Sequence, residues 1–367
     1  MFGHKIYCTF ASMKTIREPF IYLLRTGLFG TKTEETEFKL GEEEWLLVFQ
    51  VASKQKVIGL IYDAVVSLHV ESQLPAGLFE HWSKAVKTIE MVNKKQLAQL
   101  MQLQVFFEHQ HQIKFVQLKG QGIAGNYRNR LHRMCGDIDL WFGPAENVEK
   151  ANKIMEATDV KVVRGKYDDA NYMWNGTIIE HHCHLIELHN PFKIKKLLEW
   201  EHEIFQQSKD IPFPCANLLL LITHILKHQL NEGIGFRQIC DLAVSFTTLK
   251  FDKEELKTLC KKHYLYRWSK LLCSLIHRLF LIPEEKLPFP CSENPEQMLN
   301  EIWEGGDFGK EDTRFGFRPK GKWSSKWHTI KIIWHKTKIF FFYAPDESFW
   351  WLMNLIGHRS MEILHIN

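Results

Sequence analysis

Two aspartates inside an apolar run are the residues whose types and spacing point most directly to chemistry. The run reads RMCGDIDLWF at residues 133–142, where Asp137 and Asp139 flank Ile138. Alternate residues of a β-strand face the same side, so the two carboxylates would project together. Two carboxylates this close raise each other's pKa unless a cation lies between them, and Mg²⁺ prefers such oxygen ligands. The pair therefore favours a magnesium site. The structural alternative is that one aspartate caps a turn and the other is exposed at a sheet edge.

The segments on either side of the aspartates fit the same chemistry. Upstream, VQLKG ends a predicted strand at Lys119–Gly120 and opens into a helix, where backbone N–H groups and the helix dipole favour a phosphate. Downstream, LIELH places Glu187 in another predicted strand, with His189 beside it. Clustered carboxylates that follow a glycine turn suit metal-assisted phosphoryl transfer.

The order of these motifs resembles the nucleotidyltransferase superfamily related to DNA polymerase β, and more narrowly an uncharacterised bacterial branch of it. The resemblance extends over about residues 114–245. It rests on Lys119–Gly120, on Arg133 four residues before Asp137, and on IELH at residues 186–189. Two helical stretches complete it, LITHILKHQL at residues 221–230 and FRQICDLA at residues 236–243.

The resemblance implies a role for each matching residue. Asp137 and Asp139 would ligate two Mg²⁺ ions, while Glu187 would complete the second metal site and help to deprotonate the attacking group. The residues implied in nucleotide binding are Lys119, Gly120 and Arg133. The candidates for the substrate cleft are His189, His224, His228, Arg237 and Asp241.

Two of the cleft candidates also have a purely structural interpretation. His224 and His228 are four residues apart on a predicted helix and therefore share a face. Packing of two half-buried histidines against the sheet accounts for this pair, and we favour that account over a place in the cleft.

The run EHHCHLIELH offers a competing metal site, because it gathers four histidines and a cysteine over ten residues. Strand alternation places His182 and His184 on the opposite face from His181, Cys183 and His189. The run contains no C-x-x-C or H-E-x-x-H spacing, so the sequence favours magnesium over zinc.

The C-terminal stretch GFRPKGKWSSKWHTIKIIWHKTKIFFFYAP interleaves lysines with aromatic residues. Such a pattern suits binding of single-stranded nucleic acid or an amphipathic helix on a membrane surface. A last helix that packs Trp327, Ile330, Trp334 and Phe341 onto the body, with its lysines in water, is the interpretation that we favour.

The elements that must position these residues follow from the periodicity of the chain. Apolar residues recur three and four apart from Ile16 to about Gln112, short β-type runs follow, and helical periodicity returns from about Phe213. We therefore expect an α+β fold with a small mixed sheet between two helical regions. The expected divisions are an N-terminal helical region at 1–113, a nucleotidyltransferase-like core at 114–192 and a C-terminal helical region at 193–367.

Composition adds the broad class and the compartment. The 367 residues are 45% hydrophobic and 25% charged, as in ordinary globular proteins, and the net charge of +4 argues for neither nucleic acid nor membrane. Eight scattered cysteines without C-x-x-C spacing suggest reduced thiols. With neither a signal peptide nor an apolar run of about 18 residues, we expect a cytoplasmic protein without a membrane span.

The sequence thus predicts a Mg²⁺-dependent enzyme that transfers a nucleoside monophosphate from an NTP to an acceptor hydroxyl, with release of pyrophosphate. The acceptor is open among a small molecule, RNA and a protein side chain. Two other classes remain as alternatives: a catalytically inactive scaffold of this fold that binds a nucleotide or partner, and a nucleic-acid-binding module that uses the C-terminal stretch.

Overall fold

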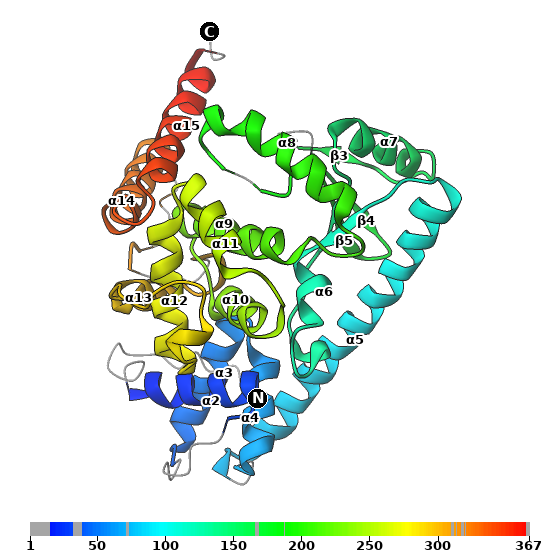
Figure 1. Ribbon diagram of the computed structural model, residues 1–367. Helices are drawn as coiled ribbons and strands as arrows, with labels where there is room; N and C mark the ends of the chain where they lie inside the picture. The colour runs from blue at the N-terminus through cyan, green and yellow to red at the C-terminus, as the bar shows by residue number, and fades with distance from the viewer. Residues whose placement is uncertain are drawn as a thin grey trace.

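The computed structural model describes residues 15–364, apart from 32–38, 71–72, 166–168, 187, 310–311, 313, 317–318 and 320. It consists of a small sheet set against a large helical body, and it confirms the α+β expectation (Figure 1). The helices before the sheet are α2 (Arg17–Phe29), α3 (Glu42–Lys54), α4 (Ile58–Leu68) and α5 (Leu78–Gln104), which a π-helical turn, η2 (Val105–Gln110), extends.

Five short strands and two helices make up the middle of the chain. In chain order they are β1 (Val116–Leu118), α6 (Lys119–Ala124), the 3₁₀ turn η3 (Arg130–His132), β2 (Ile138–Trp141), α7 (Ala145–Glu156), β3 (Val163–Arg164), β4 (Ala170–Trp174) and β5 (Thr177–His182). The strand order is β1-β2-β5-β4-β3, in which β2 and β5 are parallel and the other neighbours are antiparallel.

Helices return after the sheet, as the periodicity predicts. They are α8 (Pro191–Gln207), α9 (Pro214–Asn231), α10 (Phe236–Thr248), α11 (Lys253–Lys262), α12 (Tyr266–Phe280), η4 (Glu284–Lys286), α13 (Glu296–Gly305), η5 (Asp307–Gly309), α14 (Lys322–Phe340) and α15 (Pro345–Leu364). Within the described ranges, no helix has both the length and the apolar content needed to cross a bilayer.

A tight hairpin turn sets the register of the sheet. Asn175 and Gly176 both adopt positive φ, 48° and 73°, as a two-residue turn of the Asn-Gly type requires. The turn pairs Trp174 with Thr177 and so directs Ile179 to one face of β5 and Glu180 to the other. β4 was not among the predicted strands. The strand predicted over LIELH, residues 185–189, is wrong for the described residues there, because β5 ends at His182.

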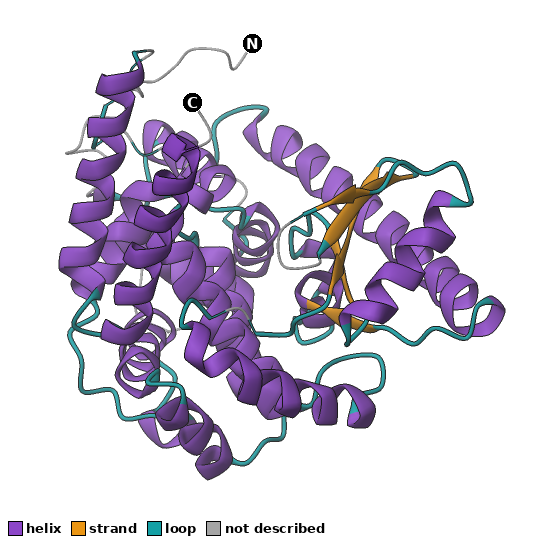
Figure 2. Cartoon of the chain, turned by 90° about the horizontal axis from the view of Figure 1, so that it is seen from above, coloured by secondary structure: helices purple, strands orange, loops and turns teal. Residues whose placement is uncertain are grey.

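The two faces of the sheet pack differently (Figure 2). Ile138, Leu140 and Ile179 join an apolar cluster with the end of α5 and with α7. On the opposite face, Trp141 joins the main core, where its ring contacts that of Phe205 at 5.0 Å. This main core also combines helices from both ends of the chain, so the N-terminal and C-terminal helices form one packed body.

The outward face of α14 contradicts the expected packing of the C-terminal stretch. The exposed fractions are 63% for Trp327, 41% for Ile330, 72% for Trp334 and 43% for Phe341. The interpretation in which these four side chains pack onto the body is therefore wrong. The opposite face of the helix, with Ile339 and Phe340, makes the contact instead.

Candidate active site

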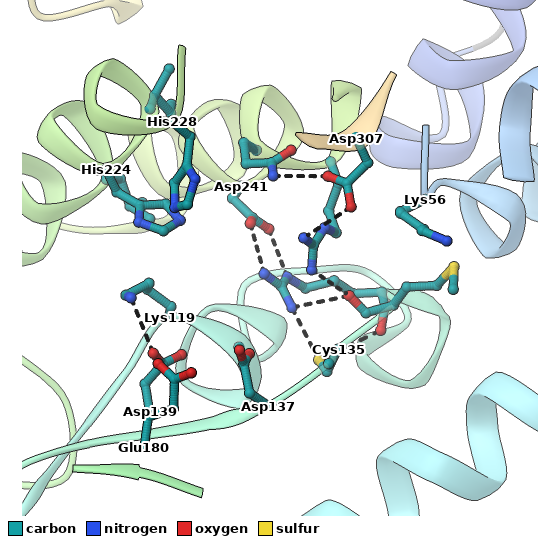
Figure 3. A pocket seen from close by; sticks show the side chains of 18 of the residues that line it. Lys56, Lys119, Cys135, Asp137, Asp139, Glu180, His224, His228, Asp241 and Asp307 are labelled. Atoms are coloured by element: carbon teal, nitrogen blue, oxygen red, sulfur yellow. Dashed lines mark hydrogen bonds and ion pairs between the residues drawn. The ribbon is translucent and has the colours of Figure 1, made fainter. Parts of the chain in front are cut away.

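A cavity of about 540 Å³ lies between the sheet and helices α9 and α10 (Figure 3). Its lining includes nine of the eleven residues that the sequence analysis selected. They are Lys119, Gly120, Arg133, Asp137, Asp139, His224, His228, Arg237 and Asp241. Residues from both sides of the chain's midpoint thus meet at one site.

The other two selected residues are Glu187 and His189. Glu187 lies outside the described residues, so its predicted role as the third carboxylate stays a prediction. His189 lies elsewhere, where its backbone N–H donates to Glu347 Oε2 at 2.7 Å and its Nδ1 lies 3.3 Å from the same oxygen. This histidine therefore serves the junction with α15 rather than the cavity.

Glu180 is the carboxylate that the sequence analysis missed. The parallel pairing of β2 with β5 places it directly opposite Asp139, and it lines the cavity. Ligand atoms of Asp139, Glu180 and His182 all lie within 4.8 Å of one another. The signal was present in the sequence, because the Asn-Gly turn and strand alternation together place Glu180 and His182 on one face.

Asp139 is the most strongly held of the acids. Its Oδ1 accepts hydrogen bonds from Lys119 Nζ at 3.0 Å and from His182 Nε2 at 2.9 Å. Burial alone would raise the pKa of Asp139, but the charge of Lys119 and the hydrogen bond from His182 hold it well below its usual range. Asp139 is therefore a carboxylate at every pH at which the protein would function.

Asp137 has the opposite electrostatic character. Burial raises the pKa of Asp137, and the negative charges of Asp139 and Glu180 raise it further. The surrounding residues therefore do not fully balance a negative charge on Asp137. Hard oxygen donors with unbalanced negative charge fit a divalent cation such as Mg²⁺.

His182 balances part of this charge on the sheet side. Its burial would lower its pKa, but hydrogen bonds with Asp139, Asp169 and Glu180 raise the pKa well above its ordinary value. Lys119 and protonated His182 therefore place two positive charges beside one oxygen of Asp139.

The turn at Lys119–Gly120 has a conformation that limits which residues it accepts. Lys119 and Gly120 have φ values of 38° and 33°, on the left-handed side that L side chains rarely adopt. A Cβ at Gly120 would lie 3.4 Å from the carbonyl oxygen of Asp137. Glycine thus lets the chain turn sharply from β1 toward α6 beside the acids.

Arg133 lines the cavity, but its guanidinium is engaged by a partner side chain. Its Nε and one terminal nitrogen donate to the two oxygens of Asp241, each at 2.7 Å, and Tyr127 Oη donates to the same carboxylate at 2.6 Å. The side chains of Arg133 and Asp241 are buried, 4% and 6% exposed. The arginine expected to bind nucleotide therefore joins the aspartate loop to α10, which makes it a positioning residue.

Helix α5 supports the two loops of the site through side-chain amides. Asn93 donates to the carbonyl oxygens of Leu131 and Arg133, and Gln96 donates to that of Gly136. Gln121 donates to the amide oxygens of both Asn93 and Gln96, at 2.9 and 3.1 Å. Because amides three residues apart lie on one helix face, a single face of α5 holds both the glycine turn and the aspartate loop.

The helical wall of the cavity carries the paired histidines. The rings of His224 and His228 meet edge to face, with centroids 4.4 Å apart. Both line the cavity, and their place in a substrate cleft stays a prediction. Burial, together with the charges of Lys119 and His228, lowers the pKa of His224 well below its usual value, so its imidazole is neutral.

The far end of the cavity holds a second ion pair, which the sequence analysis did not foresee. Arg237 lies 3.5 Å from Asp307 Oδ2 and donates to the carbonyl oxygen of Met134. Gln238 donates to Asp307 Oδ1 at 2.9 Å. Lys56 and Lys227 add positive charge to the lining.

The histidine-rich run does not form a zinc site in the described part of the chain. His181 pairs with Asn152 and Tyr172 on the far face of the sheet, whereas His182 contacts Asp139. His184 lies 3.5 Å from Glu201, and His189 contacts Glu347. The four rings point to four separate places, so they do not converge on one ion.

Comparison with known proteins agrees with this geometry. The model of a family described as uncharacterised nucleotidyltransferase matches residues 41–281, which include every residue that lines the sheet side of the cavity. No curated protein and no solved structure matches the chain.

Proposed function

Because this chain belongs to the family of uncharacterised nucleotidyltransferases, we propose that it transfers a nucleoside monophosphate from an NTP to an acceptor hydroxyl, with release of pyrophosphate. The observation that carries the proposal is the group of three carboxylates, Asp137, Asp139 and Glu180, on one wall of a cavity of suitable size for a ligand. The reaction would take place in the cytoplasm, where NTPs are abundant. The seven described cysteines are all free thiols, which fits a reducing compartment.

Asp137, Asp139 and Glu180 are the residues that would hold Mg²⁺. The sequence resemblance implies two such ions. When bound, the ions would polarise the phosphoryl group and stabilise the charge on the attacking and leaving oxygens. Glu180 takes the place that the sequence analysis gave to Glu187. It lies opposite Asp139 and would receive a proton from the acceptor hydroxyl.

Lys119 and Gly120 would serve the triphosphate. Lys119 brings a positive charge to the border between the acids and α9, and the sharp turn at Gly120 leaves the backbone open to a close approach. The acceptor would reach the site between the sheet and the helical wall, beside neutral His224.

The experiment that tests the proposal supplies the protein with Mg²⁺, each labelled NTP in turn and a cell extract. A labelled product that forms with one or more NTPs, and that EDTA abolishes, is expected. No NTP binding at millimolar concentration in the presence of Mg²⁺ would exclude the proposal at this site.

One feature favours a second candidate, a scaffold that binds a nucleotide without turnover. Lys119 and His182 already place two positive charges at Asp139 Oδ1, where an enzyme of this type needs a metal ligand. Under this alternative, calorimetry detects NTP binding whose affinity is the same with Mg²⁺ and with EDTA, and no acceptor becomes labelled.

The third carboxylate gives a prediction with a matched control. Glu180→Gln removes the proton acceptor next to Asp139, and turnover should fall by about 100-fold or more. Glu187→Gln makes the same chemical change seven residues away and should leave turnover within about threefold of wild type if Glu180 has the role. The reverse order of effects would return the role to Glu187. The measurement is the rate of pyrophosphate release.

The glycine turn gives a prediction on nucleotide binding. Gly120→Val strains a backbone at φ 33° and should weaken NTP binding far more than Gln121→Asn. Lys119→Ala should weaken it by about 1.5–3 kcal/mol, the usual contribution of a hydrogen bond to a charged group. Calorimetric titration with Mg²⁺ measures both. Tight binding that Gly120→Val leaves unchanged would place the nucleotide elsewhere.

A further inference from the structure

Helix α14 is apolar on two opposite faces, but the body covers only one of them among the described residues. Its inner face carries Ile339 and Phe340, which are 6% and 0% exposed. Its outer face carries Trp327, Ile330 and Trp334, and Phe341 continues the line just beyond the end of the helix. Large exposed apolar surfaces of this kind mark sites of interaction with a partner or membrane.

The charge of α14 is entirely of one sign. Among its 19 residues are five lysines and no aspartate, glutamate or arginine. Lys331 and Lys338 are exposed. At 100° per residue they fall in the same line as Trp327, Trp334 and Phe341, so that aromatic and positive side chains alternate along the outer face.

This alternation fits the surface of a bilayer that contains anionic lipids. Tryptophan rings settle at the level of the headgroups, and lysines can extend their charged ends to anionic headgroups while their alkyl stems lie along the apolar surface. The neighbouring helix α15 adds exposed apolar side chains, Phe349 and Met353. Phe192 lies at the start of α8 and is 80% exposed. Its ring packs edge to face on that of Trp350 in α15, with centroids 5.4 Å apart.

The same residues fit nucleic acid less well. Ile330 offers no flat ring on which a base could stack, and the outer face has lysines but no arginine, the residue that binds phosphate with two parallel hydrogen bonds. We therefore propose that the outer face of α14 binds the surface of anionic membranes. The protein then acts as a peripheral membrane protein held by this helix.

Vesicle flotation of the full chain tests the proposal. Wild type should float with vesicles of mixed phosphatidylcholine and phosphatidylglycerol, not with phosphatidylcholine alone, and high salt should weaken the binding. The pair Lys331→Gln and Lys338→Gln should weaken binding by about 30-fold, since two lysines near an anionic surface are lost. The pair Trp327→Ser and Trp334→Ser should abolish most of it.

Matched controls lie on other surfaces of the molecule. Met91 and Met101 are each 70% exposed on α5, so their replacement by serine removes comparable apolar surface. Lys250 and Lys286, also exposed, provide the charge control as a pair of glutamine substitutions. Both control pairs should bind vesicles as wild type does, and thermal melts establish that all variants are folded.

Three results would overturn the proposal. The first is that wild type does not float with anionic vesicles, or that the α14 variants float as well as wild type. The second is that labelled single-stranded RNA, rather than vesicles, binds wild type and is lost in the same variants. The third is that wild type binds no vesicles but is a dimer in light scattering, and that the variant with Trp327→Ser and Trp334→Ser is a monomer.

Discussion

Replacement of Asp139 by asparagine should reduce turnover by about 10³-fold or more, because the proposed function makes it a metal ligand that supplies several kcal/mol of charge stabilisation. Asp137→Asn should have an effect of similar size on the rate of pyrophosphate release. These are the largest effects on activity that we expect from single substitutions. Full activity in either variant would exclude the aspartate pair as the metal site.

The two variants should differ in stability although they change neighbouring aspartates. Asp139→Asn leaves Lys119 and buried His182 without their shared carboxylate, and the free energy of unfolding should fall by about 3 kcal/mol. Asp137→Asn removes a carboxylate whose pKa is raised by burial and by two other acids, so its melting temperature at neutral pH should rise. Severe unfolding of Asp137→Asn would mean that this residue has a structural role.

The dependence of stability on pH follows from the directions of these pKa shifts. The folded-state pKa of Asp137 is raised, so wild type loses stability as pH rises through it, and the advantage of Asp137→Asn disappears below the unfolded value of about 3.9. The folded-state pKa of Asp139 is lowered. The stability contributed by Asp139 is therefore present above that unfolded value and is lost as pH falls toward the folded-state pKa.

Arg133→Met should lower the free energy of unfolding by about 3–5 kcal/mol, because it leaves Asp241 as a buried charge without its arginine. The double variant Arg133→Met and Asp241→Leu should recover most of this loss, since neither charge then remains buried. Denaturant unfolding of both variants measures the effect. If Arg133→Met costs less than about 1 kcal/mol, the pair contributes little to the fold and Arg133 is free to bind nucleotide.

The sequence was sufficient for the features that depend on local pattern. The α+β organisation follows from the change in periodicity near residue 113. The aspartate pair was found from alternation in a predicted strand, although β2 begins at Ile138 and Asp137 lies directly before it. Lys119, Gly120 and the paired histidines were found because the order of their motifs resembles that of the nucleotidyltransferase superfamily. All of these residues line one cavity.

Features that depend on pairing across the chain were not predictable in the same way. Glu180 is defined by the register between β2 and β5, which are separated by α7 and two other strands. Arg133 and Asp241 are 108 residues apart, and nothing local indicates that they pair. The outer face of α14 was misassigned because both faces of that helix are apolar, so periodicity could not decide which of them packs.

The ion pair between Arg133 and Asp241 also has a consequence for how large molecules would enter. It joins the two walls of the cavity by two hydrogen bonds of 2.7 Å between buried charges. Separation of the walls to admit a large molecule would therefore cost the free energy of breaking this buried pair. A volume of about 540 Å³ is in the range that encloses one drug-sized ligand. Under the proposed function an NTP would fill this space, so an acceptor of any length would present only its reacting end, and the rest of that molecule would remain outside in the solvent.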